Sequence, residues 1–211
     1  MRKVLLLLIT CVAACTVGTT RGAAATGTTR AAAATGTTRA TADDGRYVDT
    51  LAASHPEYLP EIAVGAEAPE ISAPDTLGHV IRLSDYRGQY VAVDFWATWC
   101  GDCRRETPAF KRLYDDMKDA TVNGARVQFL SYSFDRDASR WKSYVIKQGF
   151  TWPQVSTLQA NWHDIPVTGA YGLHWIPAFL LITPDGKVAG KAITAEGLRQ
   201  LLVDEAHGER D

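Results

Sequence analysis

The residues of this sequence best suited to chemistry are Cys100 and Cys103, which are separated by two residues. Two thiols at this spacing can form a disulfide with each other and exchange it with a disulfide of another protein. The run from Val93 to Cys103 places the pair where an apolar strand gives way to a helix. Because free N–H groups and the helix dipole favour a thiolate there, we expect Cys100 to have the lower pKa and to be the nucleophile. Cys103 would then be the resolving thiol.

The elements that must position this pair can be predicted from the pattern of apolar residues. Residues 90–96 are β-branched and aromatic on both faces, as expected of a central strand buried on both sides, and Asp94 is the only acid in it. A turn at residues 75–78 followed by residues 80–83 predicts a short hairpin upstream. Further strands are expected at 127–134, 177–182 and 187–191, and helices at 104–117, 141–148 with Gly149 as its cap, and 196–206. This order predicts an α/β domain in which helices flank a mixed sheet.

The N-terminal segment reads as an export signal. Met1 to Lys3 is a short basic start, and the uncharged run of residues 4–14 is too short to cross a bilayer as a helix, which takes about 20 residues. A basic start, an apolar run and small residues are typical of a secretory signal. We therefore expect residues 1–14 to be a signal peptide and the protein to be exported.

Two further cysteines, Cys11 and Cys15, lie in or beside this segment. Residues 12–15, Val-Ala-Ala-Cys, resemble the lipobox of bacterial lipoproteins, which implies that Cys15 is acylated and anchors the chain to a membrane. The alternative is an ordinary signal peptide in which Cys15 is incidental. With Cys11 in the signal and Cys15 lipidated, each of Cys100 and Cys103 has only the other as a possible disulfide partner within the chain.

A nine-residue repeat follows, at residues 18–26, 27–35 and, in part, 36–41. No unit contains a large apolar side chain, so stacking of the units would gain too little to offset chain entropy. We expect residues 15–45 to be a lipid-anchored flexible linker, about 25 to 30 Å between ends. An adhesive or partner-binding role for the repeats is the alternative.

Composition limits the classes of function. At 211 residues the chain holds one ordinary domain with appendages. Its 22 basic and 24 acidic residues create no strong field that would favour nucleic acid. Without residues 1–45, 17 basic and 22 acidic residues remain, a net charge near −5 that argues against direct adsorption of the domain to anionic lipid.

Three groups of residues together resemble a known family. They are Trp-Ala-Thr-Trp-Cys-Gly-Asp-Cys at 96–103, Trp-Ile-Pro at 175–177, and the upstream pair Gly-Ala-Glu-Ala-Pro at 65–69 and Asp-Thr-Leu-Gly at 75–78. The sequence resembles the thioredoxin superfamily, and within it the envelope-tethered thiol-disulfide oxidoreductases of the TlpA and ResA type. The resemblance implies a thioredoxin fold with an N-terminal β-hairpin extension over about residues 62–211.

The resemblance also assigns substrate-facing residues. Pro177 is expected to be a cis-proline that faces the cysteines, and a cis bond is uncommon enough to imply a purpose. The backbone of Ile176 would pair with an extended substrate segment, and Trp99 would form a rim of the site. The alternative for Pro177 is an ordinary proline at the start of a strand.

Two acids are assigned to proton handling in the same way. Asp94 stands at the place of the family's buried acid, which assists deprotonation of the resolving thiol, and Glu106 matches a glutamate that ResA-type proteins keep near the site. Two acids near two thiols would titrate as a coupled set. The alternatives are a water-contacting residue at a strand edge for Asp94 and a helix-dipole acid for Glu106.

Asp102, between the cysteines, departs from many relatives, which have a proline or a basic residue there. Its negative charge would disfavour the Cys100 thiolate and raise the pKa of that thiol. A less stabilised thiolate makes the disulfide harder to reduce, so the pair should lean toward a reductant.

The sequence therefore predicts an exported oxidoreductase that reduces disulfides of exported proteins in a bacterial cell envelope. By resemblance its electron donor would be a membrane thiol transporter of the DsbD or CcdA type. No organic cofactor is expected, because no nucleotide-binding glycine motif follows a strand, and no metal is expected at the site. The client is not specified, and residues 161–172 are left unassigned as a candidate client-selecting insert.

Three other functions remain open. An oxidase or isomerase of the same fold would differ only in redox poise. A peroxiredoxin-like peroxidase would need Thr-x-x-Cys, but Ala97 stands three residues before Cys100 and Thr98 two. A copper- or zinc-binding envelope module would use the two cysteines as half a site, with His174 as the nearest histidine to the cis-proline loop.

Overall fold

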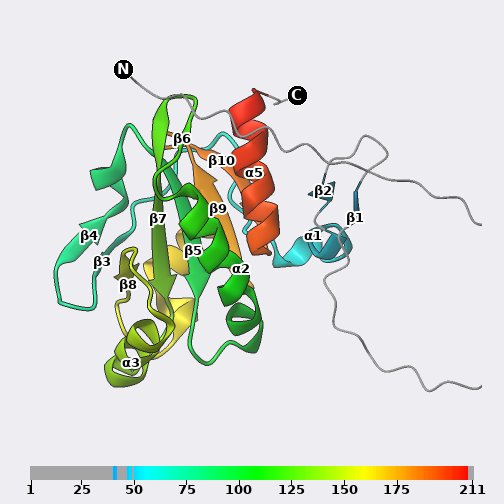
Figure 1. Cartoon of the computed structure of the whole chain (residues 1–211). Helices are drawn as coiled ribbons and strands as arrows, with labels where there is room; N and C mark the ends of the chain where they lie inside the picture. Colours follow the sequence, from blue (N-terminus) through cyan, green and yellow to red (C-terminus); the bar gives the residue numbers. More distant parts are fainter. Residues whose placement is uncertain (1–39, 42–46, 49, 209–211) are drawn as a thin grey trace, which may run out of the picture. The chain divides into compact units, whose positions relative to one another are not determined.

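The computed structural model describes residues 40–41, 47–48 and 50–208 (Figure 1). The expected signal peptide, Cys15 and almost all of the expected linker lie outside the described residues. Two short strands, β1 (Ala40–Thr41) and β2 (Tyr47–Val48), pair antiparallel, and α1 (Thr50–Ser54) follows them. No helix within the described part of the chain is long and apolar enough to cross a membrane.

A six-stranded mixed sheet forms the centre of the domain. The strand β5 (Tyr90–Trp96) lies in its middle, parallel to β7 (Ala125–Ser133) and antiparallel to β9 (Ala178–Ile182). The remaining strands are β10 (Val188–Ala192) beside β9, and β6 (Thr121–Val122) and β8 (Gln154–Val155) beside β7. This is the α/β thioredoxin fold that the sequence predicts.

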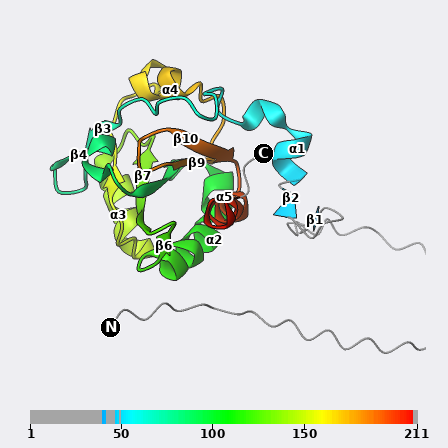
Figure 2. The same cartoon turned by 90° about the horizontal axis from the view of Figure 1, so that it is seen from above.

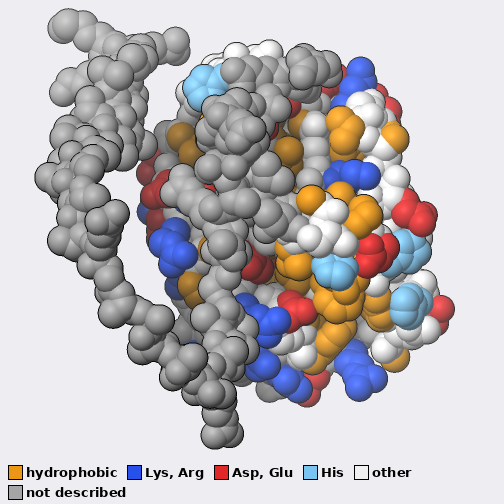
Figure 3. All heavy atoms as spheres, turned by 90° about the vertical axis from the view of Figure 1, so that its right-hand side faces the viewer, with side chains coloured by type: hydrophobic (Ala, Val, Ile, Leu, Met, Phe, Trp, Pro, Cys, Tyr) orange, Lys and Arg blue, Asp and Glu red, His pale blue; other side chains and the backbone are white. Residues whose placement is uncertain are grey.

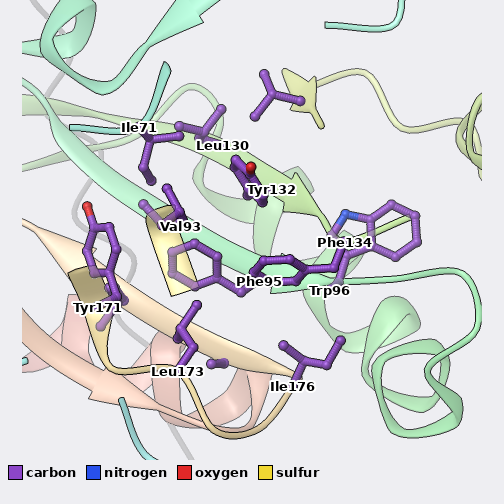
Figure 4. Close-up of a cluster of buried hydrophobic side chains, with 14 of the residues drawn as sticks. Ile71, Val93, Phe95, Trp96, Leu130, Tyr132, Phe134, Tyr171, Leu173 and Ile176 are labelled. Carbon is purple, nitrogen blue, oxygen red and sulfur yellow. The ribbon is translucent and has the colours of Figure 1, made fainter. Parts of the chain in front are cut away.

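Helices cover both faces of the sheet (Figure 2). The helices α2 (Gly101–Met117) and α5 (Ala195–His207) pack on one face, and α3 (Ala138–Gln148) and α4 (Pro166–Tyr171) on the other. Successive residues of β5 point to opposite faces. Ala92 therefore joins the cluster with Phe110 of α2, whereas Phe95 joins the cluster with Tyr171 of α4 (Figure 4).

The upstream hairpin is present as β3 (Ser72–Pro74) paired antiparallel with β4 (Val80–Arg82). Asp75 accepts the backbone N–H groups of Leu77 and His79 at 2.8 and 2.9 Å, which closes the turn between the strands. A 3-10 turn at Leu83–Tyr86 then leads into β5. A second one, Pro56–Tyr58, follows α1. The predicted N-terminal hairpin extension is confirmed.

Local signals explain most helix boundaries. Asp137 caps α3 by accepting the N–H groups of Ser139 and Arg140, and Gly149 ends the same helix in the left-handed conformation, as predicted. Helix α2 begins at Gly101, three residues before the predicted start, because Cys100 itself acts as the N-cap. Proline 177 precedes β9 rather than starting it.

The stretch 161–172, which the sequence left unassigned, contains a 3-10 turn at Trp162–Asp164 and α4. Thr168 donates its hydroxyl to the Trp162 carbonyl at 2.5 Å, which ties the two together. Proline at the first position and Gly172 in the left-handed conformation after the last mark the bounds of α4. At six residues the helix is too short for its periodicity to be recognised.

Charges of both signs are mixed on the face that Figure 3 shows. On the face shown in Figure 3, basic and acidic side chains are interspersed with hydrophobic ones. No single-sign field covers this face, in agreement with the mild net charge of the sequence.

We predict that Gly149→Ala lowers the free energy of unfolding by about 1 kcal/mol, because φ of +64° at Gly149 is costly for a residue with a Cβ. An added Cβ would meet only Lys111 Nζ at 4.0 Å, so sterics contribute little. Urea denaturation of the oxidised protein measures the change. Gly169→Ala is the matched control, since this helical glycine has open space around it and should lose nothing. Equal losses in both variants would contradict the prediction.

Candidate active site

The cysteine pair lies at the first turn of α2, where β5 ends. Cys100 and Cys103 form a disulfide with Cα atoms 5.3 Å apart, and both residues are buried. The backbone N–H of Cys103 points at Cys100 Sγ, 3.0 Å away, so the sulfur occupies the helix N-cap position. In the reduced protein the same N–H and the helix dipole would stabilise a thiolate on Cys100.

The loop before β9 faces this sulfur. The peptide bond between Ile176 and Pro177 is cis, as the resemblance predicts, and the Ile176 carbonyl oxygen lies 3.5 Å from Cys100 Sγ. The Ile176 side chain is buried in the same cluster as Trp96 and Phe134 (Figure 4). The backbone of this loop is therefore held against the reactive sulfur.

The N-terminal segment braces the same loop from outside. Tyr58 stacks on Trp175 with ring centroids 4.3 Å apart, and His174 Nε2 lies 2.9 Å from Glu61 Oε1. The backbone N–H of Glu61 also donates to the Gly172 carbonyl at 3.0 Å. Residues 58–61 thus support the cis-proline loop.

Asp94 is buried on the α2 side of the central strand, with 9% of its surface exposed. In the sheet it pairs with Ser131 of β7 and Phe179 of β9, so the alternative of a residue at a strand edge is wrong. Ser131 Oγ donates to Asp94 Oδ2 at 3.0 Å, and Trp152 Nε1 donates to Ser131 Oγ at 2.8 Å. The carboxyl group therefore has a fixed orientation among apolar neighbours.

Burial raises the pKa of Asp94 to about 7, because desolvation penalises the charged form and the nearby charge of Glu106 adds to the effect. The hydrogen bond from Ser131 acts in the opposite direction. Asp94, Glu106 and Cys103 line one small cavity. The structure thus brings the two predicted acids together on the side of the resolving cysteine.

Glu106 has a second contact that the sequence does not indicate. It is half-buried in α2, and its Oε2 accepts the backbone N–H of Ala195 at 2.8 Å. Ala195 is the first residue of α5, whose free N–H groups favour a carboxylate. Glu106 therefore joins the active-site helix to the start of α5.

Trp99 forms the exposed rim of the site. It is 46% exposed, and its Nε1 lies 3.3 Å from the Phe134 carbonyl oxygen, to which it donates. The indole is thereby fixed beside the nucleophile position and open to solvent.

Sequence reasoning missed Asp135, which holds the loop before the cysteines. Its carboxylate accepts the backbone N–H of Thr98 at 2.9 Å, the Thr98 hydroxyl at 2.5 Å and the Ser133 hydroxyl at 2.7 Å. Its position right after a buried strand that runs parallel to β5 is a signal that could have identified it.

Asp102 is not an unpaired charge, as the sequence argument assumed. Its carboxylate forms a salt bridge with Arg105, three residues later in α2. The Arg105 guanidinium also lies within 3.8 Å of the position that a Cβ would take at Gly101. A positive group therefore offsets the acid between the cysteines.

The arrangement can carry out thiol–disulfide exchange. A dithiol at a helix N-terminus and a buried acid with a raised pKa can provide a nucleophile and a proton acceptor, and the backbone before the cis-proline lies against the reactive sulfur. Within the described residues, no group of three or more His, Cys, Asp or Glu side chains could hold a metal ion.

Known proteins with similar sequences include thiol-disulfide oxidoreductases. The AhpC/TSA family matches residues 64–191. Thiol-disulfide oxidoreductase ResA of Geobacillus kaustophilus is 34% identical over 127 residues, which cover 60% of this chain and 67% of that protein. ResA of Geobacillus thermodenitrificans is 33% identical over 144 residues, covering 67% of this chain and 77% of its own.

Solved structures agree in fold. The thioredoxin domain of a thiol-disulfide oxidoreductase from Bacteroides vulgatus matches with a TM-score of 0.60 and 30% identity, covering 68% of this chain and 98% of its own. A thiol-disulfide oxidoreductase from Bacteroides fragilis matches with a TM-score of 0.58 and 26% identity, over 65% and 98% of the two chains. With the disulfide, the cis-proline and this fold, the chain belongs to the AhpC/TSA family of the thioredoxin superfamily, as a thiol-disulfide oxidoreductase of the ResA type.

Proposed function

We propose that this protein reduces disulfides of exported proteins. The observation that carries the proposal is the position of Cys100 Sγ, which caps α2 and lies 3.5 Å from the carbonyl oxygen of Ile176 before the cis-proline. A client segment that pairs with the backbone of Ile176 would bring its disulfide to this sulfur.

The proposed reaction has two exchange steps. In the reduced protein, the Cys100 thiolate attacks one sulfur of the client disulfide and releases the other as a thiolate, which takes up a proton. Cys103 then gives its proton to the Asp94 carboxylate and attacks Cys100 Sγ, which releases the second client sulfur as a thiolate. This thiolate takes up a proton from water, and Asp94 returns the proton of Cys103 to water. Two electrons pass from the protein to the client, both client sulfurs are protonated from water, and the protein is left with the Cys100–Cys103 disulfide.

The proposal extends to the surroundings of the enzyme. A signal peptide at residues 1–14 and acylation of Cys15 would place the domain on a bacterial envelope membrane, with residues 15–45 as its linker. The oxidised protein then needs a dithiol donor, for which we propose a membrane thiol transporter of the DsbD or CcdA type. An oxidase or isomerase would use the same site with a higher reduction potential.

We predict that the cysteines have distinct roles. Cys103→Ser should accumulate a mixed disulfide between Cys100 and a disulfide-bonded model protein such as insulin, because the resolving thiol is missing. Cys100→Ser should form no such adduct, and both variants should lose insulin reductase activity by about a hundredfold or more. Non-reducing electrophoresis and precipitation of the insulin B chain measure the two effects. An adduct in Cys100→Ser, attached through Cys103, would reverse the assignment.

A further prediction concerns Asp94 and the second step. Release of a fluorescent peptide from a preformed mixed disulfide on Cys100 should speed up as the pH rises through about 7, because Asp94 must be charged to accept a proton. Asp94→Asn should lack this pH dependence and release the peptide about ten- to a hundredfold more slowly. Stopped-flow fluorescence gives both profiles. A variant with the wild-type profile would remove Asp94 from the step.

The pH dependence of the free energy of unfolding of the oxidised protein tests the pKa of Asp94 independently. Because folding raises the pKa of Asp94, the stabilisation by its neutral form is complete below about pH 4 and is lost as the pH rises to about 7. Relative to Asp94→Asn, the wild type should lose free energy of unfolding over this window, by up to about 1.4 kcal/mol per pH unit. If the free energy of unfolding changed with pH equally in the wild type and in Asp94→Asn, the pKa of Asp94 would not be raised by folding.

We also predict the redox poise. The reduction potential of the wild-type pair should lie near or below about −250 mV, at the thioredoxin end of the scale. Asp102→Asn should raise the potential and Arg105→Gln should lower it, each by less than about 30 mV, because the two groups are partly exposed and oppose each other. The double variant should lie near the wild type. A wild-type value above about −180 mV would indicate an oxidase or isomerase instead.

A further inference from the structure

A groove beside the redox site is not used by the chemistry described above. It has a volume of about 390 Å³, enough for one or two side chains of a peptide. Its lining includes Trp99, Arg136 and Arg140, and, from the stretch 161–172, Asn161 and Trp162. Because Trp99 directly precedes Cys100, an occupant of this groove would sit beside the reacting disulfide.

The groove is preformed, because contacts within the fold hold the side chains that line it. Trp99 is fixed through its indole N–H to the Phe134 carbonyl, and the Trp162 ring packs on the Phe134 ring with centroids 5.4 Å apart. Asn161 accepts the N–H of His163 at 3.2 Å, which shapes the turn that carries Trp162. Two indoles thus line a groove of fixed shape.

The two aspartates in the groove lining, Asp135 and Asp137, accept hydrogen bonds from residues of the fold. Asp135 is buried and accepts three hydrogen bonds from Thr98 and Ser133. Asp137 accepts two backbone N–H groups at the start of α3, at 2.9 and 3.0 Å. Both carboxylate oxygens of Asp135 and Oδ1 of Asp137 therefore accept hydrogen bonds from within the fold.

The two arginines are different. Arg136 and Arg140 are both exposed, and neither guanidinium has an ion pair or a hydrogen bond with another residue that the structure describes. A guanidinium fork matches a carboxylate in shape and charge, and it also stacks on aromatic rings. The groove therefore combines two available guanidinium groups with two indole surfaces.

We propose that this groove selects client segments that carry an aspartate or glutamate side chain within a few residues of the reacting cysteine. Arg136 and Arg140 bind the carboxylate, and Trp99 and Trp162 contact its aliphatic part and the neighbouring backbone. This inference rests on the proposed function and adds the class of segment that is preferred.

The test uses two disulfide-bridged peptides that differ only in a glutamate or a glutamine two residues from the reacting cysteine. The full-length reduced protein should show a kcat/KM about tenfold higher for the glutamate peptide. Arg136→Gln/Arg140→Gln should bring the ratio of the two values to twofold or less. Equal values in the wild type, or a preference retained in the double variant, would overturn the proposal.

A matched control separates the groove from general charge. Lys142→Gln/Lys147→Gln removes two positive charges from exposed positions of α3, the helix that carries Arg140, outside the groove lining. This variant should keep the tenfold preference. If it loses the preference as fully as the arginine variant, the effect is long-range attraction and the groove is not the cause.

A binding measurement keeps the inference distinct from the proposed function. The same peptides with serine for cysteine are titrated against the oxidised protein, with indole fluorescence as the signal. The glutamate peptide should bind about tenfold more tightly, and the arginine double variant should lose this difference. If neither disulfide peptide is reduced but this difference remains, the proposed function fails and the groove stands; equal affinities overturn the groove.

Discussion

The direction of three neighbouring strands is the constraint on which the site depends. β5 and β7 run parallel, so their carboxyl ends meet at one edge of the sheet, and β9 runs antiparallel, so its beginning lies at the same edge. The cysteines follow β5, Asp135 follows β7 and Pro177 precedes β9. Residues from three distant parts of the chain meet there without any long loop, because each is attached to a strand end that the sheet already fixes.

The alternation of side chains along β5 places the acid. Ala92 and Asp94 point to the face that α2 covers, where Ala92 belongs to the same buried cluster as Phe110. An aliphatic residue in place of Asp94 would suit this position in energetic terms, since a buried carboxyl is stable only with hydrogen bonds or a proton. The chain from Trp152 through Ser131 to Asp94 supplies one hydrogen bond, and the raised pKa supplies the proton below about pH 7. The fold thus retains an energetically costly group in the small cavity that Cys103 also lines, as the proposed proton transfer requires.

The sequence predicts the fold and the reactive pair well because their signals are local. The strand 90–96, the helix cap at Gly149 and the Cys-x-x-Cys spacing are each readable within a few residues. It predicts poorly what depends on packing between distant segments. The hydrogen bonds between Asp135 and Thr98 join residues 37 positions apart, Glu106 accepts the N–H of Ala195, and the stacking of Tyr58 on Trp175 joins the N-terminal segment to the cis-proline loop. The pairing of Asp102 with Arg105 is local, at a spacing of three in a helix, and could have been inferred.

Long-range and short-range electrostatics act in opposite directions at the groove. Residues 46–211 carry 17 basic and 22 acidic residues, so the domain as a whole repels an acidic segment weakly. At physiological ionic strength this repulsion is screened beyond about 8 Å, whereas a guanidinium in contact with a carboxylate is screened much less. A preference for acidic segments must therefore arise at contact, after encounter, and it will affect the lifetime of the complex more than its rate of formation. Because Trp99 joins this groove directly to Cys100, a longer lifetime gives the client disulfide more time within reach of the attacking sulfur.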